Sequence, residues 1–150
     1  MALIAYLVIE ADQRHTRAEL LGMFWPELTE EKARNNLRVI LALMRDTFKV
    51  ESPQNPTVIG SNRHEVWFAG QDQRWLDVAE FQRLLASTHS HAHTQRVSCA
   101  PCQQVLAEAI QLYRGELLRG FHVDGCPAFE EWLLIRRESC HLQAIELLEE

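Results

Sequence analysis

Apolar residues recur at helical spacing through most of the first fifty positions. The first ten residues carry such a stripe, which predicts a helix over residues 2–11. Thr16 is a predicted N-cap, because Glu19 follows three residues later and the two match a capping box. The helix that begins there should end near Trp25, since Pro26 disfavours helical backbone in the residue before it.

The next predicted helix has the clearest separation of apolar and polar sides. Thr29 is its predicted N-cap, and carboxylates follow in the first turn, where they complement the helix dipole. Its apolar stripe extends to about position 49. That stripe consists of Ala33, Leu37, Ile40, Leu41, Met44 and Phe48. A separate basic stripe consists of Arg34, Arg38, Arg45 and Lys49, with Asn35 beside it.

Beyond this helix the pattern changes to turn residues and short extended runs. Residues 57–59 are predicted to form a strand, residues 60–63 a turn, and residues 65–68 a second strand. The two strands would form a β-hairpin after a helix pair. This is the element order of a winged helix, in which the second helix of the pair enters the major groove and the hairpin contacts the DNA backbone.

The second half of the chain is predicted to consist of helices and one polar loop. One helix begins near Asp77, a second spans about 100–113, and a third begins near Phe129. Residues 87–98, rich in histidine, form a loop by composition. The chain is therefore predicted to be mostly α-helical.

The composition is typical of an ordinary soluble globular protein. It is 47% hydrophobic and 24% charged, and no run of about 18 apolar residues predicts a membrane span. The apolar N-terminus lacks the basic flank of a signal peptide. The four cysteines follow no disulfide framework, which favours reduced thiols in a cytoplasm. Two domains are expected, over residues 1–72 and 73–150.

The net charge of −6 argues against a chain that simply coats nucleic acid, but residues 32–49 carry five basic side chains and one acidic side chain. Arginine pairs with guanine edges and asparagine with adenine edges, whereas lysine mostly contacts phosphate. The residues expected to face the groove are Arg34, Asn35, Arg38 and Arg45. Those expected to contact phosphate are Lys49 and Arg63. The alternative, a surface helix whose charges are merely solvated, stays open at this point.

Seven segments resemble, in order and with similar spacing, the bacterial transcriptional activator domain family found in Streptomyces antibiotic regulatory proteins. They are LIAYL at 3–7, HTRAELL at 15–21, FWPEL at 24–28, EKARNNLR at 31–38, WLDVAEF at 75–81, LYRGELLRGF at 112–121 and FEEWL at 129–133. The resemblance implies an OmpR-type winged helix-turn-helix with a β-hairpin wing, followed by a tetratricopeptide-like helical bundle. It also implies a bacterial transcription regulator whose partners are double-stranded DNA and RNA polymerase or another regulatory domain. A homodimer stays open.

Two features depart from the family pattern. In the family, several strands precede the first helix and further helices follow the last one here, so we expect a chain truncated at both ends. Val39 and Ala42 also stand where relatives often carry polar residues in the recognition helix. The alternative function is therefore a protein-interaction module of a larger signalling regulator, with little or no DNA binding.

A zinc site is the main competing chemistry. Cys99 and Cys102 are spaced so that two thiolates reach one zinc ion, and His91 and His93 could complete a tetrahedron. One such pair is a weak signal, so packed cysteines beside a histidine-rich loop are favoured, and no metal or cofactor is expected. An enzyme is not expected either, because the sequence has no nucleophile motif and no Gly-rich phosphate loop. Four tryptophans are expected to be core and interdomain anchors: Trp25, Trp67, Trp75 and Trp132.

Overall fold

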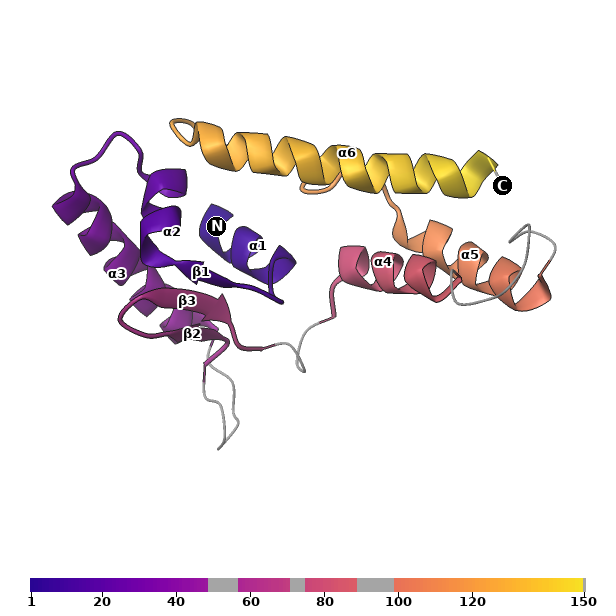
Figure 1. Cartoon of the computed structure of the whole chain (residues 1–150), viewed down its shortest axis with the longest axis horizontal. Helices are drawn as coiled ribbons and strands as arrows, with labels where there is room; N and C mark the ends of the chain where they lie inside the picture. The colour runs from indigo at the N-terminus through magenta and orange to yellow at the C-terminus, as the bar shows by residue number, and fades with distance from the viewer. Residues whose placement is uncertain (49–56, 71–74, 89–98, 150) are drawn as a thin grey trace. The chain divides into compact units, whose positions relative to one another are not determined.

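The computed structural model describes residues 1–48, 57–70, 75–88 and 99–149 (Figure 1). Over these residues the chain is mostly helical and has one three-stranded antiparallel sheet, which confirms the predicted mostly α class. The helices are α1 (Ala2–Ile9), α2 (Arg17–Phe24), α3 (Glu30–Thr47), α4 (Asp77–Thr88), α5 (Ala100–Leu112) and α6 (Pro127–Glu149). The strands are β1 (Arg14–Thr16), β2 (Ile59–Ser61) and β3 (Glu65–Phe68). In the described part of the chain, no helix has the length and apolar character needed to cross a membrane.

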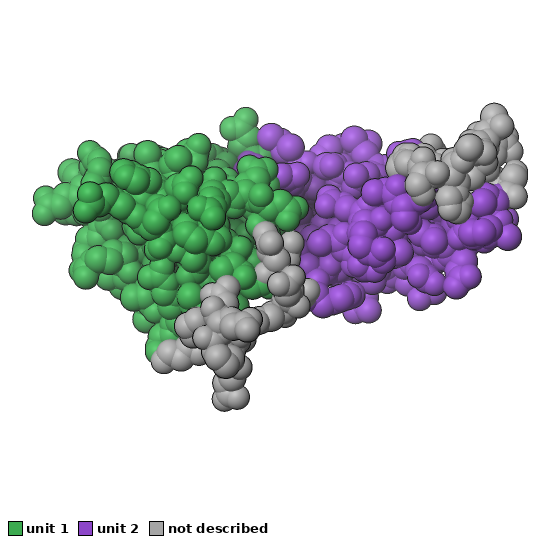
Figure 2. All heavy atoms as spheres, turned by 60° about the horizontal axis from the view of Figure 1, so that its bottom comes forward, with its two compact units in different colours: residues 1–74, 122–131 green, residues 75–121, 132–150 purple. Residues whose placement is uncertain are grey.

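Two compact units make up the chain, as Figure 2 shows in green and purple. The first contains residues 1–74 and 122–131, and the second contains residues 75–121 and 132–150. The expected boundary after residue 72 falls in a stretch, 71–74, that lies outside the described residues. The sequence did not predict that the segment 122–131 joins the first unit.

Contacts with α2 explain why this later segment belongs to the first unit. Phe129 is fully buried, and its ring centroid lies 5.5 Å from that of Phe24. The Cys126 thiol donates to the Phe24 carbonyl oxygen at 3.3 Å. These are contacts between residues about a hundred positions apart, which local periodicity does not reveal.

The start of α2 follows the predicted capping box. The Thr16 hydroxyl accepts a hydrogen bond from the Glu19 amide at 3.2 Å, and the Glu19 carboxylate accepts one from the Thr16 amide at 2.8 Å. These bonds from Thr16 lower the pKa of Glu19. The helix ends at Phe24, just before Trp25 as predicted.

Helix α3 begins after Thr29, as predicted, although the Thr29 side chain makes no capping hydrogen bond. Its buried residues are Ala33, Leu37, Leu41 and Met44, four members of the predicted apolar stripe. The prediction was wrong for Phe48, which is 38% exposed. The helix ends one residue earlier, so the helical spacing no longer directs that side chain into the core.

The sheet differs from the predicted hairpin in two ways. Its strand order is β1-β3-β2, so that the unpredicted strand β1 pairs with β3 through Arg14 opposite Trp67. Strand β2 begins at Ile59 instead of position 57, which places Gly60 inside the strand and not in the turn. Glycine is required there, because a Cβ at Gly60 would lie 2.3 Å from the ring of Trp67.

The second unit packs α4 and α5 side by side (Figure 1), with the later part of α6 contributing to the same core. Its buried cluster consists of Phe81, Leu84, Leu85, Leu106, Ala109 and Ala144. Helix α5 ends at Leu112, close to the predicted position, and Gly115 follows with a φ of 125°. Helix α6 begins at Pro127, two residues before the predicted start.

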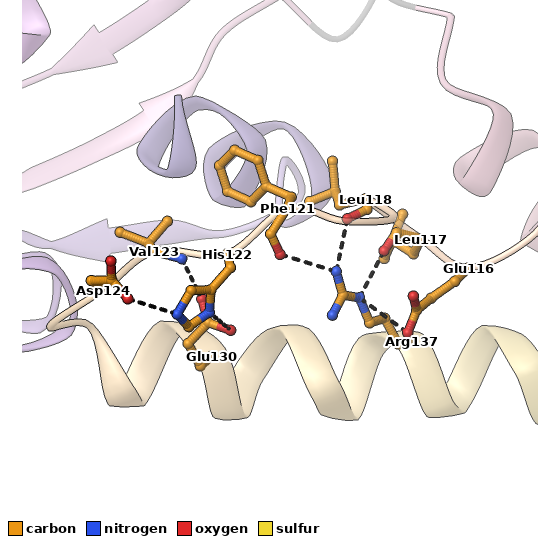
Figure 3. A network of polar contacts seen from close by, with 9 residues as sticks. All are labelled: Glu116, Leu117, Leu118, Phe121, His122, Val123, Asp124, Glu130 and Arg137. Atoms are coloured by element: carbon orange, nitrogen blue, oxygen red, sulfur yellow. Dashed lines mark hydrogen bonds and ion pairs between the residues drawn. The ribbon is translucent and has the colours of Figure 1, made fainter.

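Arg137 of α6 holds the chain that follows α5 through backbone carbonyls (Figure 3). Its guanidinium donates to the carbonyl oxygens of Leu117 at 2.9 Å, Leu118 at 2.7 Å and Phe121 at 3.2 Å. A carboxylate oxygen of Glu116 lies 3.6 Å from its Nε. Since only 18% of the Arg137 side chain is exposed, this is a structural arginine.

His122 makes a second polar cluster at the start of α6, also drawn in Figure 3. Its Nδ1 lies 3.0 Å from the carboxylate of Glu130, and its Nε2 lies 2.9 Å from that of Asp124. The other Glu130 oxygen accepts from the Val123 amide at 2.7 Å. Glu130, and then Asp124, raise the pKa of His122 because each favours the protonated ring.

The tryptophan prediction was wrong for Trp75, which is 70% exposed. Trp25, Trp67 and Trp132 are half-buried instead of filling a core. The large indole ring is rarely buried completely, and at Trp67 one face meets Gly60 while the Arg14 guanidinium covers the ring at 4.3 Å from its centroid.

Candidate nucleic-acid interface

Helix α3 buries one side against the first unit and leaves a broad surface open. The exposed residues of this surface, which we call the α3 face, are Glu30, Glu31, Lys32, Arg34, Asn35, Arg38, Val39, Ala42, Leu43, Asp46 and Thr47. Its first half carries the basic and amide groups together with two carboxylates, while its second half carries three apolar side chains and one carboxylate. Three of the four residues predicted to face a groove lie on it, and the fourth, Arg45, does not.

Asn35 and Arg38 form a polar pair in the first half of the α3 face. A guanidinium nitrogen of Arg38 donates to the amide oxygen of Asn35 at 2.9 Å. The pair is exposed, so both side chains are accessible to a ligand. An arginine beside an asparagine offers the two side chains that pair bidentately with guanine and adenine edges.

Arg34 also lies on the α3 face, paired with a carboxylate of the same helix. Its Nε donates to Glu30 at 3.0 Å, one helical turn away, and both side chains are about 70% exposed. An exposed pair of this kind contributes at most about 1 kcal/mol to stability. Arg34 can therefore exchange Glu30 for a phosphate at little cost.

The structure corrects the role expected for Arg45. Its half-buried side chain turns to the hairpin, where Nε donates to the Ile59 carbonyl oxygen at 3.2 Å. Another guanidinium nitrogen donates to the Ser61 hydroxyl. The helical spacing did place Arg45 near Arg38, but β2 lies close enough to bind it. Lys49, predicted to contact phosphate, lies outside the described residues.

Arg63 is exposed in the turn between β2 and β3, as predicted. Asn62 makes this turn rigid, because its side-chain oxygen accepts from the amides of His64 and Glu65, each at 2.7 Å. Arg17, at the start of α2, donates from two nitrogens to the Asn62 carbonyl oxygen, each at 3.1 Å. The turn thus presents Arg63 on a fixed backbone.

Sequence reasoning missed Arg14 and Arg17 as members of this region. Arg14 is the first residue of the unpredicted strand β1, and Arg17 directly follows that strand. Arg14 covers Trp67 and lies 3.6 Å from the Glu65 carboxylate. The capping box at Thr16 was the one available signal, since it puts Arg17 in the first turn of a helix that precedes α3.

A hollow of about 460 Å³ also occurs in the first unit. It is lined by Tyr6, Gln13, Arg14, His15, Glu19, Gly22, Met23 and Ala128. Nδ1 of His15, a residue only 5% exposed, lies 3.3 Å from the Tyr6 hydroxyl. This lining contains no serine, cysteine or threonine next to the histidine, so it favours no nucleophilic chemistry.

Of the four residues considered as zinc ligands, the two cysteines are described, and both lie at the start of a helix. Cys99 is the N-cap of α5, and Cys102 is buried in its first turn. His91 and His93 lie outside the described residues. Within the described ranges, no group of three or more His, Cys, Asp or Glu residues could hold a metal ion. All four cysteines are described and none is in a disulfide, and burial raises the pKa of the Cys126 and Cys140 thiols.

No family model, curated protein or solved structure matches the chain. The features of the chain that bear on its function are the order of the elements in the first unit and the side chains that α3 and the hairpin expose.

Proposed function

We propose that the chain is a DNA-binding transcription regulator of the bacterial transcriptional activator domain type, and that its first unit is a winged helix. The element order α1-β1-α2-α3-β2-β3 supports this, because a helix pair is followed by a two-stranded hairpin. The pairing of β1 with β3 supports it further by joining the hairpin to the strand that precedes the helix pair.

The observation that carries the proposal is the exposed Asn35–Arg38 pair on α3, beside a hairpin whose rigid turn exposes Arg63. In this function α3 enters the major groove. Arg38 pairs with guanine, Asn35 pairs with adenine, and Arg34 contacts either a base or a phosphate. Arg63 and Lys49 contact phosphate, and these cationic contacts give salt-dependent affinity despite the acidic chain.

The second unit acts in this proposal as a tetratricopeptide-like helical domain. The packing of α4 against α5, with α6 added to the same core, supports helices stacked in sequence order. Such a domain would contact RNA polymerase or another regulatory domain. The proposed function also places the protein in the cytoplasm.

One observation favours a second candidate, a protein-interaction module that does not bind DNA. Val39 is 45% exposed and Leu43 is 60% exposed, both in the second half of the α3 face. Apolar side chains can contact thymine methyl groups, but they also suit an apolar protein partner. DNA binding itself distinguishes the two candidates.

The test is the affinity of the whole chain for duplex DNA, measured by fluorescence anisotropy over a salt series that starts at low salt. We expect Arg38→Ala to weaken binding by about 1–3 kcal/mol. The matched control is Arg83→Ala, which removes an exposed arginine that pairs with Glu80 on α4 of the second unit. Absence of wild-type binding at low salt would overturn the DNA-binding proposal and favour the interaction module.

A further inference from the structure

We propose that Arg45 and Arg17 position the hairpin against the helix pair, and that they act in DNA binding through Arg63 without touching DNA. This inference rests on the proposed function for its role in binding, while the anchoring itself is testable without DNA. It assigns to two basic residues of the region a role other than phosphate contact.

Arg45 fixes the strand β2 from the second half of α3. Figure 1 shows this part of α3 beside β2. The guanidinium donates both to the Ile59 backbone and to the Ser61 side chain, so one residue binds two points of the strand. A planar guanidinium provides several donors in a fixed geometry, which suits it to holding a backbone in one orientation.

Arg17 fixes the other end of the same hairpin from the start of α2. Its backbone amide donates to the His64 carbonyl oxygen at 2.8 Å, and its side chain donates twice to the Asn62 carbonyl oxygen. The turn is therefore bound on both sides of Arg63. Arg45 and Arg17 together tie the hairpin to both helices of the proposed DNA-binding pair.

The position of Arg63 depends on these anchors. The turn residues 62–64 form a rigid unit around the Asn62 side chain, so the turn moves as one body when the hairpin moves. A phosphate contact needs a donor within about 3 Å of an oxygen. Loss of either anchor would shift Arg63 relative to α3 and weaken its contact while every proposed DNA-contacting side chain is retained.

A double-mutant cycle tests the coupling between Arg45 and Arg63. We expect Arg45→Ala alone to weaken duplex binding about fivefold, and to weaken it less than about twofold when Arg63 is already alanine. Arg45→Lys should weaken binding almost as much as alanine, because lysine retains the charge but not the fork of donors. A direct phosphate contact predicts the opposite, with additive effects and recovery by lysine.

Amide hydrogen exchange of the whole chain tests the anchoring without DNA. We expect Arg45→Ala and Arg17→Ala to accelerate exchange of the hairpin amides over residues 59–68, whereas Arg63→Ala leaves them unchanged. Unchanged exchange in both anchor variants would overturn the proposal. If the wild-type chain binds no duplex, the DNA-binding function fails and this measurement still decides whether the arginines anchor the hairpin.

Discussion

Helices α3 and α6 both carry arginines, but the two helices use them differently. On α3, Arg34 and Arg38 are exposed and donate hydrogen bonds to side chains of their own helix. On α6, Arg137 is mostly buried and donates to three backbone carbonyls. Arg45 resembles Arg137 more than its neighbours on α3. The presence of nearby backbone acceptors, not helical spacing, therefore distinguishes a structural arginine from one available to a ligand.

The largest expected effect comes from removing the buried arginine. Arg137→Ala should lower the free energy of unfolding of the second unit by about 2–4 kcal/mol, because it leaves several carbonyl groups without their charged donor. Arg34→Ala, the exposed counterpart on α3, should change stability by less than about 0.5 kcal/mol. Urea titrations of both variants, followed by circular dichroism, measure the difference. Equal effects would contradict the distinction between the two kinds of arginine.

The hairpin that Arg45 binds should be sensitive to its glycine. Gly60→Ala should destabilise the first unit by about 1–3 kcal/mol, because the added methyl group overlaps the ring of Trp67. Gly22→Ala is the matched control, since no neighbouring atom lies within 4 Å of a Cβ there and the residue is helical. That change should stabilise by about 0.5–1 kcal/mol. Thermal unfolding monitored by tryptophan fluorescence would reveal the opposite signs, and a harmless Gly60→Ala would argue against the observed position of β2.

A smaller effect is expected at His122, whose ring lies between two carboxylates. Because folding raises its pKa, this contact stabilises the folded chain fully below the unfolded value of 6.5 and is lost as pH rises through the folded pKa. The stability difference between wild type and His122→Gln should therefore shrink as the pH rises above about 6.5. Urea midpoints at several pH values measure it. A difference that grows with pH would contradict the contact.

Sequence patterns that span a few residues predicted most of helices α2 and α3, but they predicted neither strand β1 nor the contacts between the helices and the hairpin. The capping box at Thr16 and the apolar stripe of α3 act within a few residues, so the sequence contains them directly. Strand β1 has three residues without apolar alternation, and it exists because β3 pairs with it from fifty positions away. The same limit applies to Arg45, since its role depends on where β2 passes.

The candidate site was predictable to a similar degree. Asn35, Arg38 and Arg63 are exposed as the pattern indicated, because exposure follows from helical spacing and from turn composition. Whether a residue touches DNA or holds the hairpin depends on hydrogen bonds between elements distant in sequence. The contact of Arg17 with the hairpin was not predicted for this reason, although Arg17 directly follows the correctly predicted N-cap Thr16.

The most direct test of the DNA-binding account is a selection of bound duplexes from a random pool, carried out with the wild-type chain, Arg38→Ala and Arg83→Ala. The account predicts that the wild type and Arg83→Ala enrich the same short motif, and that Arg38→Ala loses the preference for guanine at one position of it. Enrichment of no motif by the wild type, or an unchanged motif with Arg38→Ala, would contradict the proposal that α3 reads DNA through this arginine.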